Sequence, residues 1–377
     1  MINEILAESD VADVLKKALN SERLTLEDGI RLLESDDIHA IGAVANEIRK
    51  KHNGNKTYYI VNRHINYTDL CENQCKFCAY SRDVNSSDGM TMSVDDIVNQ
   101  ALSEYEKIKY TELHIVGGLN PSLSIDYYEN MLSSLKNVLP DVHLQAFTAV
   151  EIAYISKISN LSVEDTLKRL KNAGLGSIPG GGAEIFSKRV RDIICPEKIS
   201  GEEWLSVLEI AHNLGIKSNS TMLYGHIETN EEIIDHMIKI RDLQDKTNGF
   251  MTFIPLKFHS GNNKLGEYKL SNSSINDLKL YAVSRLMLDN IPHIKVFWIM
   301  LGIKFAQVAL SYGADDIDGT VVEEKIVHRA GAKTPEGMTV KQLRDIIIET
   351  QTVPFERDTL YNEVRRDEAG LPAISKC

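Results

Sequence analysis

Cysteine, aromatic residues and long apolar runs are all scarce in this sequence. Its 377 residues include five cysteines, which are too few for a disulfide framework. No apolar run approaches the ~18 residues that cross a bilayer, so we predict no membrane span. The N-terminal segment lacks the basic stretch and apolar core of a secretory signal, and the chain is therefore predicted to be cytoplasmic.

Positive charge is also in short supply. The chain has 42 lysine and arginine residues against 54 aspartate and glutamate residues, which gives a formal net charge of -12. An acidic balance of this size repels phosphate backbones, and no local cluster of basic residues offsets it. We therefore predict no nucleic-acid partner. The 43% of hydrophobic residues is typical of an ordinary globular protein.

Alternating strand and helix patterns organise most of the chain. Residues 1–55 have apolar residues at spacings of three and four, which predict an N-terminal helical extension. From 56 to 330, runs such as ELHIVGG and HIKVFWIM alternate with helical runs, several beginning with a capping box such as Ser200 with Glu203. This pattern predicts the α/β class and a (β/α) TIM-type barrel with its site at the C-terminal strand ends. Residues 331–377 are predicted to be a C-terminal helix and tail packing on the barrel, with a charged, peripheral end from about residue 356.

Three of the five cysteines fall within the segment CENQCKFC, on the loop after the first predicted barrel strand. They are Cys71, Cys75 and Cys78. Cys195 and Cys377 stand alone. Three thiolates suit a 4Fe-4S cluster with one iron left open for an external molecule. Structural zinc prefers four ligands, and His64 just upstream is the candidate fourth, so zinc stays open as the alternative.

The spacing Cys-x3-Cys-x-aromatic-Cys, with Phe77 as the aromatic residue, resembles the hallmark of radical S-adenosylmethionine (SAM) enzymes. Segments between about residues 56 and 361, among them NRHINYTDLCENQCKFCAYSR, SIPGGGAEIF and DDIDGTVVEEKIVHRAGAKTP, resemble the aminofutalosine synthase family of the futalosine pathway to menaquinone. Two sister families share the PGGGAEI-type segment and stay open as alternatives. They are the cyclic dehypoxanthinyl futalosine synthases and the deazaflavin-cofactor synthases.

The resemblance implies that the three cysteines hold a 4Fe-4S cluster whose open iron binds SAM. It further implies that the 5'-deoxyadenosyl radical from SAM adds to the enol double bond of 3-[(1-carboxyvinyl)oxy]benzoate. Loss of bicarbonate then gives 6-amino-6-deoxyfutalosine. An electron donor such as flavodoxin or ferredoxin is the implied partner. A site for this reaction must exclude water and neutralise two substrate carboxylates.

Several predicted strand ends carry candidate cofactor-binding residues. The resemblance implies that Gly117 and Gly118 approach the methionine part of SAM and that the aromatic ring between the cysteines lies near the adenine. Glu184, after a glycine triplet, offers an acceptor to ribose hydroxyls. Tight turns at the glycines and shielding of the cluster by the ring are the alternatives. The predicted cofactor-binding residues are Phe77, Gly117, Gly118, Glu151, Gly181 and Glu184.

Polar side chains just past the IKSNSTML segment are the predicted catalytic residues, since such groups at a barrel strand's C-terminal end are typical of an active site. They are Tyr224, His226 and Glu228. Arg285, in the apolar helical run LYAVSRLMLDN, is predicted to bind a substrate carboxylate, with a solvated helix face as the alternative. Other candidates for that cation are Arg82, Lys257, His259, His293 and Lys295.

Overall fold

Seven parallel strands form one sheet of the molecule. The computed structural model describes residues 2–266, 273–321, 325–331, 333–367 and 370–375, and Cys377 lies outside them. The sheet follows chain order from β2 to β8, and each neighbouring pair is parallel, as repeated βα units require. The strands are β2 (Asn62–Ile65), β3 (Glu112–Ile115), β4 (His143–Ala146), β5 (Ser177–Ile178), β6 (Lys217–Tyr224), β7 (Phe250–Lys257) and β8 (His293–Ile294).

Two further strands join the edges of this sheet. β1 (Lys56–Ile60) runs into β2 with only Val61 between them, and β9 (Asp316–Gly319) pairs in parallel with β1. On its other side, β9 reaches β8 through an isolated bridge between Lys295 and Asp316. The strands therefore close around a common interior, which confirms the predicted α/β barrel.

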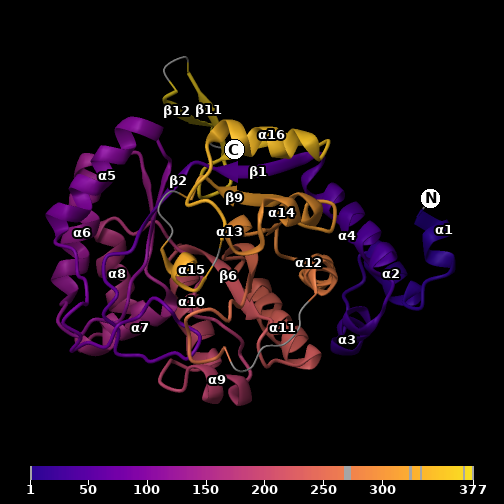
Figure 1. Cartoon of the computed structure of the whole chain (residues 1–377), viewed down its shortest axis with the longest axis horizontal. Coiled ribbons are helices and arrows are strands. Elements are labelled where there is room, and N and C mark those ends of the chain that lie inside the picture. Colours follow the sequence, from indigo (N-terminus) through magenta and orange to yellow (C-terminus); the bar gives the residue numbers. More distant parts are fainter. Residues whose placement is uncertain (1, 267–272, 322–324, 332, 368–369, 376–377) are drawn as a thin grey trace.

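Helices cover the outside of the barrel, with α5, α6 and α8 on one side of the view in Figure 1 and α11 and α12 on the other. The predicted capping box begins α10, where Ser200 Oγ accepts a hydrogen bond from the Glu203 N–H. The helices that follow β2 are α5 (Val94–Ile108), α6 (Ile125–Val138), α7 (Ala149–Ile158), α8 (Val163–Ala173), α9 (Lys188–Ile194), α10 (Gly201–Asn213), α11 (Asn230–Thr247), α12 (Ser274–Met287), α13 (Trp298–Leu301), α14 (Ile303–Ala309) and α15 (Ile326–Arg329). The short helices α13 and α15 lie at the C-terminal ends of the strands and are not part of the outer layer.

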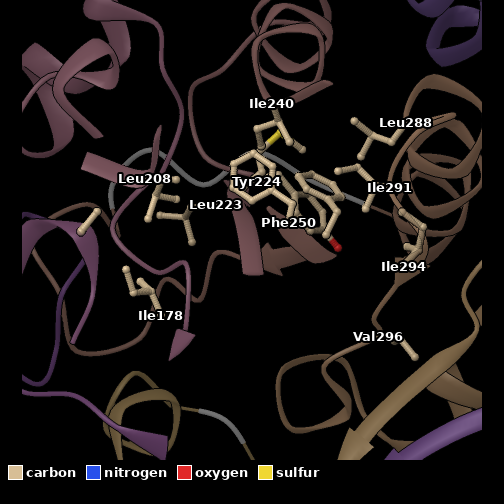
Figure 2. Close-up of a cluster of buried hydrophobic side chains, with 14 of the residues drawn as sticks. Ile178, Leu208, Leu223, Tyr224, Ile240, Phe250, Leu288, Ile291, Ile294 and Val296 are labelled. Carbon is tan, nitrogen blue, oxygen red and sulfur yellow. The ribbon is translucent and has the colours of Figure 1, made fainter. Parts of the chain in front are cut away.

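An apolar layer between the strands and the helices holds the barrel together. Figure 2 shows part of it, where Leu208 of α10 and Ile240 of α11 belong to the same buried cluster as Tyr224 and Phe250. All four side chains are buried. Removing such area from water is the main driving force of folding. The outer face of the sheet therefore anchors the helices and leaves the inner face for a site.

The N-terminal extension packs on two of these helices. α4 lies against α12 and α3 lies against α11. Arg23 forms ion pairs with Asp245 and, at 2.9 Å, with Asp289. The extension is therefore attached to one flank of the barrel, away from α5 and α6 in Figure 1. Its helices are α1 (Ile2–Ala7), α2 (Ala12–Leu19), α3 (Leu26–Glu34) and α4 (Ile38–Asn53).

The C-terminal segment returns to the first strand. After α16 (Val340–Glu349), β10 (Val353–Arg357) pairs in parallel with β1. β11 (Glu363–Arg366) and β12 (Pro372–Ser375) extend this second sheet, whose order is β12-β11-β10-β1-β9. Within the described part of the chain, no helix is both long and apolar enough to cross a membrane.

The beginning of the tail is less peripheral than its charge predicts. Arg357 is 2% exposed, and its Nε donates to Asp316 Oδ2 at 2.6 Å. The Tyr361 hydroxyl donates to the same oxygen at 2.6 Å. The prediction of a peripheral tail from about residue 356 is therefore wrong at these positions, because the buried pair ties β10 to β9 across β1.

Replacing Arg357 with methionine is expected to lower the free energy of unfolding by about 3–5 kcal/mol, because the buried Asp316 carboxylate then lacks its cation. Arg365→Met is the matched control. The Arg365 side chain is 72% exposed beside Glu363, so its loss should cost less than about 1 kcal/mol. Urea denaturation of both variants measures the free energy of unfolding. An equal loss of stability in the two variants would contradict the conclusion that the buried pair holds β10 to β9.

Candidate functional site

A cavity of about 320 Å³ lies at the C-terminal ends of the strands. Side chains from β2 to β9 and the loops that follow them line its wall, and the cysteine loop, residues 71–78, borders it. Every predicted cluster ligand and cofactor-binding residue lines this cavity. These residues are Cys71, Cys75, Phe77, Cys78, Gly117, Gly118, Glu151, Gly181 and Glu184.

Backbone contacts hold the cysteine loop in place. The Lys76 N–H donates to the Ile194 carbonyl at 2.8 Å, which ties the loop to the C-terminal end of α9. Gly118, just past β3, lies against the residue before the loop. A Cβ at Gly118 would stand 2.2 Å from the Leu70 carbonyl oxygen, so a side chain does not fit there. The glycine pair therefore allows the end of β3 to approach the cysteines closely.

A buried ion pair lies beside the cysteine loop. Lys198 Nζ is 2.6 Å from Glu184 Oε1, and the two side chains are 12% and 8% exposed. Glu184 has a φ of 49°, a left-handed conformation that is uncommon outside glycine and clusters at functional sites. Lys198 Nζ also lies 5.3 Å from the ring centroid of Phe77, a cation–π contact. Sequence reasoning missed Lys198, which follows no strand and belongs to no motif.

Strand register brings polar side chains together on the cavity wall. His64, His114 and Gln145 are register neighbours across β2, β3 and β4, and all three line the cavity. The rings of His64 and His114 stack with their centroids 4.4 Å apart. Burial lowers the pKa of both imidazoles, so both are neutral at pH 7. Lys295 supplies a positive charge to the wall, with Nζ 3.1 Å from Asp318 Oδ1.

Comparison with known proteins identifies the family. The radical SAM superfamily matches residues 65–240, and the CofH/MqnC C-terminal region matches residues 247–369. The aminodeoxyfutalosine synthase of Thermus thermophilus is 43% identical over 93% of this chain and 95% of its own length. That of Streptomyces coelicolor is 43% identical over 95% of each chain. The chain belongs to the radical SAM superfamily.

Other radical SAM relatives are nearly as similar. The 5-amino-6-(D-ribitylamino)uracil–L-tyrosine 4-hydroxyphenyl transferase of Methanococcoides burtonii is 40% identical to this chain. The match covers 94% of this chain and 100% of the transferase. Among solved structures, methylornithine synthase has a TM-score of 0.71 at 16% identity, covering 90% of this chain and 97% of its own. The FeFe-hydrogenase maturase HydG of Carboxydothermus hydrogenoformans has a TM-score of 0.74 at 14% identity, covering 96% and 86%. These structures share the fold.

The radical SAM family implies a 4Fe-4S cluster and SAM, and the cysteine loop fits the cluster. Its thiols are free, and burial raises the pKa of Cys71 and raises that of Cys75 to about 12, so binding must displace their protons. Among the described residues, no three His, Cys, Asp or Glu side chains gather as ligands of one metal ion. In a 4Fe-4S cluster each cysteine binds a separate iron, so the three thiols need not converge on one metal ion.

Both carboxylate oxygens of Glu151 accept hydrogen bonds from other groups of the protein. Its Oε1 accepts hydrogen bonds from the Tyr67 hydroxyl at 2.7 Å and from the Gly117 N–H at 3.0 Å. Its Oε2 accepts from Thr148 N–H and Oγ1, both at 2.8 Å, and so completes the capping box of α7. Burial raises the pKa of Glu151. Glu151 therefore positions the end of β3 at Gly117. The Gly117 N–H donates its hydrogen bond to Glu151.

The predicted catalytic trio lies outside the cavity lining. Thr221 lines the cavity from β6, and alternation along the strand turns Tyr224 to the opposite face, into the apolar layer of Figure 2. Glu228 accepts hydrogen bonds from the backbone N–H groups of Gly225 and, at 2.9 Å, His226. His226 and Glu228 shape the loop after β6 and Tyr224 packs in the core, so the structure does not bring the trio to the cavity, and its catalytic role stays a prediction.

Arg285 also has a structural position. It is 0% exposed, and its guanidinium donates to the carbonyls of Leu288 at 2.8 Å and Pro292 at 3.1 Å, ahead of the first residue of β8. Its complete burial contradicts the alternative of a solvated helix face. Arg285 lies outside the cavity lining, so its binding of a substrate carboxylate stays a prediction. Of the other predicted cations, Lys295 lines the cavity. Those outside its lining are Arg82, Lys257, His259 and His293.

Proposed function

We propose that this radical SAM enzyme converts SAM, water and 3-[(1-carboxyvinyl)oxy]benzoate into 6-amino-6-deoxyfutalosine, methionine and bicarbonate, a step of menaquinone biosynthesis. The adenosyl carbon bonds to the enol carbon of the substrate, and the lost carboxyl group leaves as bicarbonate with the oxygen of water. The observation that carries the proposal is the 43% identity, over nearly the whole chain, to two proteins named aminodeoxyfutalosine synthase.

The proposal assigns the cluster to Cys71, Cys75 and Cys78, which line one cavity with the candidate SAM-binding residues. When bound, the cluster supplies the electron that cleaves SAM, and an electron donor such as flavodoxin or ferredoxin supplies it in turn. The chain's own part is to hold the reactants and exclude water. Apolar side chains on the cavity wall support this role. They are Val116, Leu119, Val150, Ile254, Leu256 and Phe297.

Lys295 is the proposed partner of a substrate carboxylate. A fixed cation in a water-poor cavity holds an anion more strongly than one exposed to water. Lys295 is 7% exposed, lines the cavity, and faces Asp318 as its counter-ion. The neutral imidazoles of His64 and His114 add hydrogen-bonding groups without a charge of their own. This wall suits an anionic aromatic substrate.

A second candidate function is the 4-hydroxyphenyl transfer named for the Methanococcoides burtonii relative, whose printed substrates are 5-amino-6-(D-ribitylamino)uracil and L-tyrosine. The observation that favours it is 40% identity over the whole length of that relative, only slightly below the identity to the synthases. The uracil substrate carries no carboxylate and L-tyrosine carries one carboxylate balanced by an ammonium group, whereas the enolpyruvyl benzoate carries two carboxylates. The two candidates therefore differ in the net charge that the cavity must bind.

The deciding experiment offers both substrate sets to the anaerobically reconstituted enzyme with SAM and dithionite. Mass spectrometry is expected to detect 6-amino-6-deoxyfutalosine with the enolpyruvyl benzoate and no adduct with the uracil and tyrosine. The opposite pattern would assign the second function. Formation of 5'-deoxyadenosine alone with either set would contradict both substrate assignments while leaving the radical SAM chemistry in place.

A further inference from the structure

Lys198 is a buried cation beside the cysteine loop. It lies in the segment between α9 and α10, and its side chain is 12% exposed. Its Nζ is 2.6 Å from Glu184 Oε1 and 5.3 Å from the ring centroid of Phe77, the residue between the second and third cysteines of the loop. Lys198 also lines the cavity that Cys75 and Cys78 line. The charge is therefore held against the cysteine loop, at the cavity that the thiols line.

Anchoring the loop does not require this charge. Other hydrogen bonds already hold the loop, from the Lys76 N–H to the carbonyl of Ile194 at the end of α9 at 2.8 Å and from the Gln74 N–H to the side-chain Oε2 of Glu197 at 3.3 Å. A buried ion pair is weak evidence for stability, because desolvation of the two charges offsets their attraction, and well-packed apolar residues often serve as well. The position of Lys198 therefore calls for an electrostatic explanation.

The two charges of the pair act on the cysteine loop with opposite signs. Lys198 Nζ lies over the ring of Phe77, the residue between the second and third cysteines, and Glu184 Oε1 is its counter-ion at 2.6 Å. Both side chains line the cavity that the cysteines line, where a buried charge is only weakly screened by water. Lys198 therefore favours added negative charge at the loop, and Glu184 disfavours it.

We propose that Lys198 tunes the reduction potential of the cluster held by the cysteine loop, with Glu184 limiting the effect. The inference rests on the proposed cluster ligands Cys71, Cys75 and Cys78. One electron from the donor makes the cluster more negative by one charge. Lys198 stabilises that added charge and so raises the potential, and Glu184 opposes it. Net charge near a cluster is one of the factors that set its potential.

The test compares three single variants of the full-length, anaerobically reconstituted enzyme by a redox titration monitored by electron paramagnetic resonance, without SAM or substrate. In Lys198→Met, the ratio of reduced to oxidised cluster at a fixed potential is expected to fall on the order of tenfold, about 59 mV for a one-electron couple. Glu184→Gln is expected to raise that ratio. Lys188→Met, which removes a lysine 87% exposed on α9, should leave it unchanged.

Two outcomes would overturn the proposal. One is a Lys198→Met enzyme that carries a full cluster at the wild-type potential, and the other is a shift in the same direction in Lys198→Met and Glu184→Gln. If Lys198→Met does not take up a cluster, the Glu184→Gln potential decides, since an unchanged value there contradicts the field argument. A wild-type protein that binds no iron would instead contradict the proposed cluster site, so the two failures are distinguishable.

Discussion

A Cys75→Ala variant is expected to bind no 4Fe-4S cluster and to form no detectable product. Cys75 is the middle thiol of the proposed ligand set, and it is 9% exposed in the wall of the cavity. Its removal leaves two thiolates where three are needed to hold a cluster that keeps one iron open. Iron and sulfide per chain after anaerobic reconstitution measure the first loss, and mass spectrometry of the reaction with SAM measures the second.

Cys195→Ala is the matched control for this experiment. Cys195 is 0% exposed and follows Ile194, whose carbonyl accepts the hydrogen bond from the cysteine loop. Burial raises the pKa of its thiol, which is consistent with a packed apolar residue. We expect this variant to keep its iron and activity and to lose about 1 kcal/mol of stability. Loss of the cluster in Cys195→Ala, or full iron in Cys75→Ala, would contradict the ligand assignment.

The part of the site that the sequence predicts is carried by local motifs at strand ends. CENQCKFC follows β2, the glycine pair at Gly117 follows β3, and the glycine triplet before Glu184 follows β5. In a parallel barrel the C-terminal strand ends meet, so motifs far apart in sequence converge once the alternation of strand and helix is recognised. The capping box at Ser200 is predictable for the same reason, because its two hydrogen bonds join residues three apart.

The rest of the site depends on facts that no local pattern contains. Tyr224 lies at the end of a strand, as Gly117 does, yet the alternation of side chains along β6 turns Tyr224 outward. A shift of one residue in the register of β6 would turn it inward. His64 and His114 become neighbours through the register of two strands, which is a tertiary property. Lys198 reaches the cysteine loop because the segment after α9 lies against it, with Glu197 accepting a hydrogen bond from Gln74. Periodicity identifies the strands but does not fix their register.

Lys295→Met is expected to reduce kcat/KM for 3-[(1-carboxyvinyl)oxy]benzoate by about 100-fold, a loss of about 2.7 kcal/mol of transition-state stabilisation. The reason is the proposed contact between its buried ammonium group and a substrate carboxylate. The cluster should still assemble, because the cysteines lie on a different loop. Steady-state kinetics, normalised to iron content, measure the loss. Unchanged kcat/KM in a fully loaded Lys295→Met enzyme would rule out the contact.

A second variant separates substrate binding from simple charge balance, because Lys295 also neutralises Asp318 at 3.1 Å. Asparagine is a suitable replacement for Asp318, whose φ of 68° is left-handed and is tolerated by asparagine. If Lys295 served only to balance that carboxylate, Lys295→Met with Asp318→Asn would regain wild-type kcat/KM. A contact with the substrate predicts instead that the double variant stays well below wild type, since the cation that meets the substrate carboxylate is absent from both.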